Sequence, residues 1–492
     1  MNRIVIDPER VSGEIDRNIF GGFAEHLGRC IYGGIYEPDS PRANEEGFRT
    51  DVLAALRRLG MPVIRYPGGN FASGYRWRDG VGPASERPAR TDLAWHDIET
   101  NLFGTNEFVS FCRKLGTEPY LVVNCGDGDM REARDWVEYC NGIRDTALVK
   151  LRAQHGYPGP HGVKYWGIGN EVDGHWQIGY KTPQEYARAF TEFGKVMKWV
   201  DPGIKLIAST VSTWEGEWVE RTQLLLEQAP DLIDYLALHW YVGNPDNDFT
   251  NYMAVSELLE ERLSSFEGLV KAVRLQRGIK RPVHLAVDEW NVWYRTHPRY
   301  GADTSKSKLE EIYTLEDALV AAIQLNTFIR HARSVKMANL AQIVNVIAPV
   351  FTRPDGLFLQ TIYFPFEVYS TTCGNRALDV WWEGDTFSTG SYTGVRTLDV
   401  SATLIEAKKR LTVYVVNRDK DRKMETVLQL TLGEFKGTVT AYTVNGQDIK
   451  AENTFTTPEK VVTRQTALEA QGHDLTYTFE PHSVTALVCE LT

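Results

Sequence analysis

Two glutamates, Glu171 and Glu289, end apolar stretches at residues 165–171 and 284–289, where an unpaired charge is costly. A protonated carboxyl group facing an ionised one can cleave an acetal. The first protonates the leaving oxygen, and the second attacks or stabilises the oxocarbenium-like carbon. A gap of about 5–5.5 Å between the carboxyl groups indicates retention of configuration, and a wider gap indicates inversion. The alternative for either glutamate alone is a helix cap or an ion pair with arginine.

Short apolar runs alternate with amphipathic segments between about residues 18 and 380. One amphipathic segment opens with Thr182-Pro183-Gln184-Glu185, a capping box with proline at the first helical position. Near-continuous apolar runs are typical of parallel strands covered on both faces. We predict strands at residues 19–26, 62–67, 119–126, 164–171, 204–210, 235–241, 283–290 and 335–342. Eight strand–helix units indicate an α/β fold, the (β/α)8 TIM barrel. A doubly wound sheet is the rival, but no G-x-G-x-x-G opens a helix after the first strand.

Active sites of TIM barrels lie at the C-terminal ends of the strands. The fourth and seventh strands face each other, so Glu171 and Glu289 are expected to reach one pocket. Strict alternation along the seventh strand predicts that Asp288 points away from that pocket. His239 shares a strand face with Tyr241, and a structural core histidine is its alternative reading. The polar residues at the predicted strand ends are Glu25, His26, Arg65, Asn70, Asn124, Asn170, Glu171, Ser209, Thr210, His239, Tyr241, Asp288, Glu289 and Gln342.

Charge and composition narrow the kinds of partner. The 492-residue chain has a formal net charge of −11 and a pI near 5.6. This acidity argues against nucleic acid or an anionic membrane and fits a neutral sugar better. Six scattered cysteines indicate reduced thiols, and the first residues lack the apolar stretch of a signal peptide, so a cytoplasmic protein is expected. No His-x-His, H-E-x-x-H or cysteine cluster supports a metal ion, so we expect acid/base chemistry without metal or cofactor.

Three tryptophans stand out in a chain that is 11% aromatic. Trp95, Trp176 and Trp293 lie in polar or turn-like sequence surroundings. They form either stacking walls for sugar rings, whose C–H faces pack on aromatic surfaces, or ordinary core and loop packing.

The sequence pattern changes past about residue 385. Short, alternating, β-branched segments follow at residues 412–416, 426–432, 438–444 and 476–480, with a hairpin-turn signal at Asn445-Gly446. We predict a catalytic barrel over residues 18–384 and an all-β sandwich or jelly roll over residues 385–492. The N-terminal strand within residues 1–17 is expected to join the second domain.

Seven ordered motifs resemble the α-L-arabinofuranosidases of glycoside hydrolase family 51. The resemblance runs through the barrel in the family's order and spacing and includes the trailing β domain. The motifs are GGFAEHLGR at 21–29, RYPGGNF at 65–71, FGTNEF at 103–108, WGIGNEVD at 166–173, LHWY at 238–241, VDEWN at 287–291 and AQIVN at 341–345.

The resemblance implies a retaining double displacement, with Glu171 as acid/base and Glu289 as nucleophile. It also implies that Arg65 and His239 support the nucleophile, and that Trp95, Trp293 and, less securely, Trp176 line the sugar pocket. Members of the family are typically intracellular, often hexameric, and free of metal and cofactor. The positions that match sugar-hydroxyl ligands are Glu25, Asn70, Asn170, Tyr241 and Gln342.

The leading hypothesis is an exo-acting α-L-arabinofuranosidase that trims terminal arabinose from arabinoxylan or arabinan oligosaccharides. A related barrel glycosidase, such as an endoglucanase or β-xylosidase, would use the same two carboxylates in a cleft. A non-catalytic carbohydrate-binding protein is a third possibility, which the presence of both glutamates disfavours.

Overall fold

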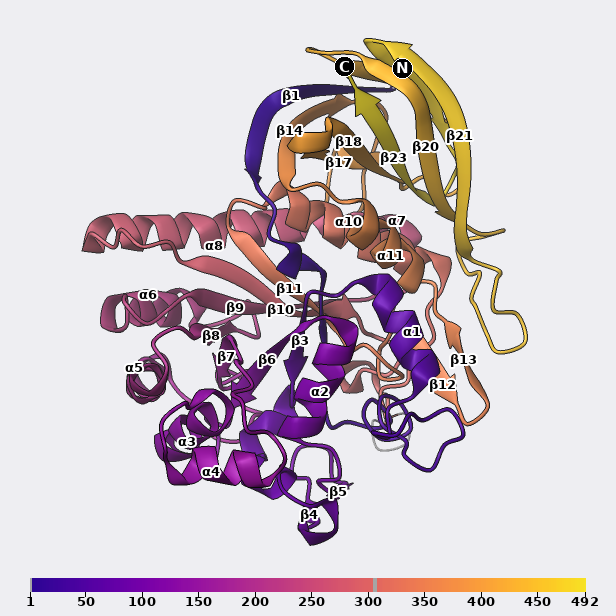
Figure 1. Cartoon of the computed structure of the whole chain (residues 1–492). Helices are drawn as coiled ribbons and strands as arrows, with labels where there is room; N and C mark the ends of the chain where they lie inside the picture. Colours follow the sequence, from indigo (N-terminus) through magenta and orange to yellow (C-terminus); the bar gives the residue numbers. More distant parts are fainter. Residues whose placement is uncertain (1, 304–307) are drawn as a thin grey trace.

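Eight parallel strands close into a barrel in the computed structural model, which describes residues 2–303 and 308–492 (Figure 1). Neighbouring barrel strands are parallel throughout. Each predicted apolar run overlaps one barrel strand, so the TIM barrel prediction is confirmed. The strands are β2 (Gly21–Phe23), β3 (Val63–Tyr66), β6 (Glu118–Val123), β7 (Tyr165–Ile168), β8 (Lys205–Val211), β9 (Tyr235–Val242), β10 (His284–Val292) and β11 (Val335–Ala341).

Helices cover the outside of the barrel. At the start of α5 the predicted capping box is present. The Thr182 hydroxyl accepts the Glu185 N–H at 3.4 Å, and the Glu185 carboxylate accepts the Thr182 N–H at 2.9 Å. Within residues 2–303 and 308–492, no helix is both long and apolar enough to cross a membrane. The helices are α1 (Thr50–Leu59), α2 (Thr105–Leu115), α3 (Met130–Asn141), α4 (Ala147–Gln154), α5 (Pro183–Val200), α6 (Trp218–Gln228), α7 (Phe249–Met253), α8 (Val255–Arg277), α10 (Leu315–Arg330) and α11 (Tyr363–Thr372).

A nine-stranded sheet forms the second unit and includes the first strand of the chain. β1 lies between β14, to which it is antiparallel, and β19, to which it is parallel. The sheet has its own hydrophobic core, with Ile4, Leu411 and Leu487 among its members. A sheet-rich C-terminal domain, as predicted, is confirmed. In spatial order the strands are β21 (Val462–Gly472), β20 (Phe435–Asn445), β23 (Ser483–Leu491), β18 (Arg410–Asn417), β17 (Leu398–Ile405), β14 (Arg376–Glu383), β1 (Asn2–Glu14), β19 (Met424–Leu430) and β22 (Asp474–Phe479).

The hairpin turn predicted at Asn445-Gly446 is wrong. β20 ends at this point, but its antiparallel partner β21 begins only after a long loop, residues 446–461. Backbone carbonyls of Ile449 and Ala451 in the loop accept hydrogen bonds from the first two N–H groups of α10, at 3.0 and 2.9 Å. Helix N-termini leave such donors unpaired, so the loop extends to satisfy them.

Helix α10 lies between the barrel and the nine-stranded sheet (Figure 1). Residues 315–329 are all buried, so the helix has no solvent-facing side. It contacts β10 of the barrel on one side and β14, β17, β18 and β23 of the sheet on the other. The two units therefore share one core helix.

Buried and half-buried charges gather where α8, α10 and the sheet meet. Asp399 on β17 pairs with Arg330 at 3.1 Å and with Arg418 at 3.3 Å. Near the end of α10, His331 contacts Glu260 and Glu267 of α8, each at 2.8 Å. We call this set the junction network, and its members are Glu260, Glu267, Arg330, His331, Asp399 and Arg418.

The pKa values of His331 and Glu260 in the junction network are those of paired ions. Burial disfavours the charge on His331, but Glu260 and Glu267 raise its pKa to about 9. Burial opposes ionisation of Glu260, but Arg330 and His331 lower the pKa of that carboxyl to about 2. The charges at this junction therefore neutralise each other.

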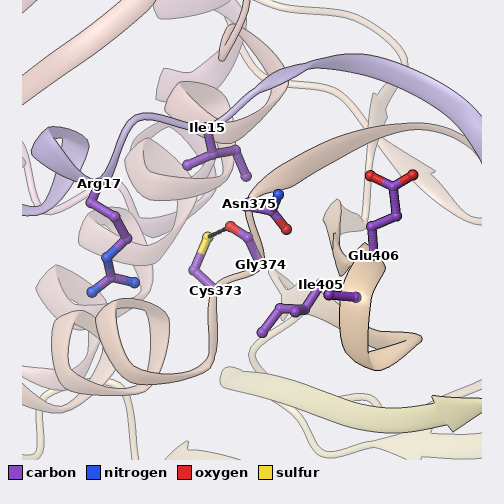
Figure 2. A pocket seen from close by; sticks show the side chains of 8 residues that line it. Ile15, Arg17, Cys373, Gly374, Asn375, Ile405 and Glu406 are labelled. Atoms are coloured by element: carbon purple, nitrogen blue, oxygen red, sulfur yellow. Dashed lines mark hydrogen bonds between the residues drawn. The ribbon is translucent and has the colours of Figure 1, made fainter.

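A cavity of about 550 Å³ also lies at the junction of the two units (Figure 2). The chain enters the N-terminal end of the barrel here, whereas TIM-barrel active sites lie at the opposite end. Glu406 supplies the one carboxyl group in its wall, so the cavity offers no pair of acids. Its lining residues are Ile15, Arg17, Cys373, Gly374, Asn375, Ile405, Glu406 and Ala407.

Candidate active site

Glu171 and Glu289 meet at the C-terminal mouth of the barrel. Glu171 follows the end of β7, and its φ of 44° places it in the left-handed region that few residues other than glycine adopt. Glu289 lies on β10. One carboxylate oxygen of each, together with a ring nitrogen of His239, lie within 4.8 Å of one another.

The Glu289 carboxylate is held from both sides. The Arg65 guanidinium donates to one oxygen at 2.5 Å, and the Tyr241 hydroxyl donates to the other at 2.9 Å. The same guanidinium donates to Asn170 Oδ1 at 2.7 Å, and the Asn170 amide donates to Asn70 Oδ1 at 3.3 Å. Five of the residues singled out in the sequence thus form one chain of contacts across β3, β7, β9 and β10.

Glu171 accepts hydrogen bonds on both of its oxygens. His239 Nδ1 lies 2.9 Å from Oε1, and the indole N–H of Trp176 donates to Oε2 at 2.7 Å. Trp176 is 55% exposed, so this bond forms at the rim of the pocket. The other ring nitrogen of His239 lies 3.3 Å from Asp288. The shorter His239 contact is with Glu171, not with Glu289, which lies at 3.4 Å.

The prediction that Asp288 points outward is wrong. Asp288 is buried, and its carboxylate accepts a hydrogen bond from Tyr120 at 2.8 Å and lies 3.5 Å from Arg65 Nε. The pairing of β10 with β9 shifts register between Ala286 and Glu289, and such an irregularity breaks strict alternation. Both acids of β10 therefore face the barrel interior. The part of Asp288 in the site was therefore not predicted, nor was that of Tyr120, although a charged residue in a buried apolar run is an available signal for Asp288.

Glu25 lies deeper in the pocket, at the end of β2. One of its oxygens accepts the Trp95 indole N–H at 3.0 Å and the Phe71 N–H at 3.1 Å, and the other accepts the Gln342 amide at 2.9 Å. A Cβ on Gly69 would lie 2.7 Å from this carboxyl group, so a glycine is needed for the close approach. Burial, reinforced by the charge of Glu289, raises the pKa of Glu25 to about 8.

Electrostatics couple the remaining groups of the site. Although burial disfavours its charge, Glu289, Asp288 and Glu171 raise the pKa of His239 well above its ordinary value. Burial alone would raise the pKa of Glu171, but the hydrogen bond and charge of His239 lower it. Burial raises the pKa of Glu289, and the neighbouring Glu171 adds to this against the pull of His239 and Arg65. The imidazole therefore carries the proton that it shares with Glu171.

An aromatic wall lines the side of the pocket next to Glu289. Trp293 packs edge-on against Tyr241 with ring centroids 5.3 Å apart. His297 packs against the outer side of Trp293 at 4.0 Å. The sequence gives no signal for His297, because its place depends on the path of the loop after β10.

Glu171, His239 and Glu289 are also the residues, among those described, whose ligand atoms are close enough together to hold a metal ion. The Arg65 guanidinium already supplies positive charge to Glu289 at 2.5 Å. A histidine and two carboxylates are a donor set that suits several divalent metals.

Two family models match most of the chain. The alpha-L-arabinofuranosidase 1 domain matches residues 55–256, and the alpha-L-arabinofuranosidase C-terminal domain matches residues 288–483. An intracellular exo-alpha-(1->5)-L-arabinofuranosidase 1 from Bacillus subtilis is 42% identical over 92% of this chain and 91% of its own. The chain belongs to the α-L-arabinofuranosidases of glycoside hydrolase family 51. Alpha-L-arabinofuranosidase C from Emericella nidulans is 41% identical over 98% of this chain and 96% of its own.

The likeness to this arabinofuranosidase family extends to three dimensions. The crystal structure of an arabinose complex of the alpha-L-arabinofuranosidase from Thermotoga maritima matches with a TM-score of 0.91 and 38% identity, covering 100% of both chains. Glu171 falls within the match to the first family model, and Glu289 within the match to the second. The arabinofuranosidase resemblance noted in the sequence is therefore confirmed.

Proposed function

We propose that this protein is a retaining, exo-acting α-L-arabinofuranosidase. It hydrolyses terminal non-reducing α-L-arabinofuranosyl residues of arabinoxylan or arabinan oligosaccharides by double displacement. The observation that carries the proposal is the meeting of Glu171 and Glu289, with one oxygen of each within 4.8 Å of the other. So close an approach supports direct attack by one carboxylate, because the carboxyl groups of inverting enzymes lie farther apart to hold a water between them.

Glu289 is the nucleophile in this proposal. It attacks the anomeric carbon while Glu171 protonates the departing glycosidic oxygen, which gives a covalent arabinosyl-enzyme and the shortened saccharide. Arg65 and Tyr241 fix both oxygens of the attacking carboxylate. Glu171 then takes a proton from water, whose oxygen displaces Glu289 from the sugar and releases arabinose with retained configuration.

The proton that Glu171 donates comes from His239. Passing it from Nδ1 to Oε1 across their 2.9 Å hydrogen bond turns Glu171 into an acid and leaves a neutral imidazole, which no longer lowers the pKa of Glu171. The Asp288 carboxylate lies 3.3 Å from the other ring nitrogen, Nε2, and so stabilises the tautomer whose proton is on Nε2. His239 is thus assigned to Glu171 more than to the nucleophile.

The other pocket residues are assigned to substrate binding. Glu25, Asn70, Asn170 and Gln342 present polar groups toward the sugar hydroxyls, supported by their mutual hydrogen bonds. Three tryptophans, Trp95, Trp176 and Trp293, supply the aromatic surfaces.

Hydrolysis of 4-nitrophenyl α-L-arabinofuranoside tests the activity, with nuclear magnetic resonance of the first-formed anomer testing retention. Turnover of an aryl xyloside or of a glucan without turnover of the arabinofuranoside would favour the alternative, a β-xylosidase or endoglucanase. Azide should rescue a Glu171→Ala variant on the activated aryl substrate, because the covalent intermediate can still form. Dialysis against EDTA should leave kcat/KM unchanged if, as we propose, neither metal nor cofactor takes part.

We further propose a cytoplasmic location and a hexameric assembly. The name of the Bacillus subtilis relative, an intracellular enzyme, supports the location. Cell fractionation tests the location. Light scattering tests the assembly, and a mass of 55.8 kDa, that of one chain, would contradict it.

For the two domains, we propose that the barrel domain ends between α11 and β14. β14 belongs to the nine-stranded sheet although it precedes residue 384.

A further inference from the structure

A row of rings leads from the nucleophile to the surface of the pocket. The Tyr241 hydroxyl touches Glu289, Trp293 packs on Tyr241 at 5.3 Å, and His297 packs on Trp293 at 4.0 Å. Tyr300 follows at 5.6 Å from His297 and is 49% exposed. The wall thus extends beyond the space that one sugar occupies at Glu289.

His297 has one free hydrogen-bond donor. Its Nδ1 accepts the backbone N–H of Arg299 at 3.0 Å, so in the neutral ring the proton sits on Nε2. Within residues 2–303 and 308–492, that Nε2–H donates to no protein group. Burial, together with the charge of Arg299, lowers the pKa of His297 below its ordinary value, which keeps the ring neutral at pH 7.

The His297 ring packs on Trp293 at 4.0 Å and lies within electrostatic reach of Glu171. The Glu171 carboxylate acts electrostatically on the His297 ring, raising its pKa against the two lowering effects. In the proposed mechanism Glu171 meets the leaving oxygen, so a ring that extends the Tyr241–Trp293 wall within reach of Glu171 is available to the sugar on the far side of the scissile bond.

The loop that carries His297 is rigid before any substrate binds. The buried Glu311 carboxylate accepts the backbone N–H groups of Tyr294, Arg295 and Thr296, at 3.1 to 3.2 Å. The Thr296 hydroxyl also donates to Glu311, at 2.9 Å, and accepts the indole N–H of Trp293 at 3.2 Å. A donor held in place in this way loses little entropy on binding.

We propose that His297 is a specificity-determining residue that donates a hydrogen bond from Nε2–H to a hydroxyl group of the leaving sugar. This inference rests on the proposed function. It distinguishes leaving groups by their chemistry, because a saccharide presents hydroxyl groups beside Glu171 whereas a nitrophenol presents none there. His297 then contributes to the hydrolysis of arabino-oligosaccharides and not to that of aryl arabinofuranosides.

The test compares two substrates in two variants. His297→Asn keeps a side chain that can accept the Arg299 N–H, because asparagine is a good N-cap, but removes the ring and its donor. His297→Phe keeps the ring against Trp293 but has no donor. We expect each variant to lower kcat/KM on α-1,5-arabinobiose by about fivefold to tenfold, mainly through KM, as loss of one neutral hydrogen bond implies. On 4-nitrophenyl α-L-arabinofuranoside, kcat/KM should change less than twofold.

His473→Asn, a change at an exposed histidine of the distant sheet, serves as the matched control. Equal losses on both substrates would overturn the inference and make His297 a purely structural cap. Unchanged kcat/KM on both would overturn it as well. A wild-type protein that does not hydrolyse the aryl arabinofuranoside would instead refute the proposed function, and with it the ground for this inference.

Discussion

Two sets of interacting charges in this molecule differ in their ratio of carboxylates to cations. The junction network has three carboxylates, of Glu260, Glu267 and Asp399, against three cationic groups. The pocket has four carboxylates, of Glu25, Glu171, Asp288 and Glu289, against only Arg65 and His239. At the junction Arg330 and His331 lower the pKa of Glu260 to about 2 against the effect of burial, whereas in the pocket burial, reinforced by Glu289, raises that of Glu25 to about 8.

This difference in charge balance separates the groups that can take part in catalysis from those that support the fold. Matched buried charges neutralise one another and are costly to break, but they have no proton to exchange near neutral pH. A pocket with too few cations must keep protons on some of its acids, and mobile protons are what acid/base catalysis uses. Changes in the pocket should therefore affect activity, and changes at the junction should affect stability.

The largest effect is expected from the two catalytic glutamates. Glu171→Ala and Glu289→Ala should each lower kcat on an arabino-oligosaccharide by about 10²–10⁴-fold or more, because a positioned acid or nucleophile is lost. Their thermal unfolding should stay near that of the wild type. Glu383→Ala, at an exposed site on β14, is the control. Wild-type rates in either catalytic variant would end the role assignment.

The junction should respond in the opposite way. Asp399→Asn leaves Arg330 and Arg418 without their shared carboxylate, so the free energy of unfolding should fall by about 3 kcal/mol in urea titrations. The kcat of the folded variant should not change. Asp145→Asn, which breaks an exposed pair with Lys150, should cost under about 1 kcal/mol. A loss of kcat in folded Asp399→Asn would blur the division between the two networks.

A pH profile sharpens the contrast within the pocket. Glu25 is neutral at pH 7 and ionises as the pH rises through about 8, which adds negative charge near Glu289. The wild-type kcat/KM should therefore fall above pH 8. Glu25→Gln should have a kcat/KM about tenfold lower but flat through this range, since it has no proton to lose.

Glu132→Gln is the matched control for this profile. Burial and two nearby aspartates raise the pKa of Glu132 to about 7, but it lies on α3, outside the pocket. In this variant kcat/KM should fall above pH 8 as it does in the wild type. If kcat/KM of Glu25→Gln still falls above pH 8, the fall is due to the ionisation of another group.

The smallest expected effect is the pH dependence of the junction. The pKa of His331 is higher in the folded protein, about 9, than in the unfolded chain, so its stabilisation is complete below about pH 6.5 and disappears as the pH rises through 9. His331→Asn should thus lose stability relative to the wild type by about 1–2 kcal/mol at pH 6 and by less at pH 10. A difference that is the same at both pH values, or that appears equally in His473→Asn, would contradict this linkage.

Most of the fold and most of the residues of the pocket could be predicted from the sequence, for a physical reason. Doubly covered parallel strands need continuous apolar runs, and barrel sites need polar groups where those runs end, so Glu171 and Glu289 were visible as exceptions. Asp288 was misread because a register shift in β10 breaks alternation, and neighbouring strands determine that shift. His297 was not found, since its place depends on contacts to Glu311 that local sequence does not encode.

The same limit explains the loop after β20. Asn445-Gly446 favours a tight turn locally, but the open N-terminus of α10 recruits the following residues over a long distance. The local turn preference of Asn445-Gly446 is overridden because the loop supplies acceptors to two distant backbone N–H groups, those that begin α10.

Helix α10 has a consequence for evolution and for protein engineering. Because it is buried on every side between barrel and sheet, each of its residues must suit two neighbours at once. Chimaeras that join the barrel of one relative to the sheet of another should fold best when the crossover keeps α10 and the 446–461 loop from a single parent. In this architecture the unit of inheritance is the helix together with the loop that caps it, and it crosses the boundary between the two domains.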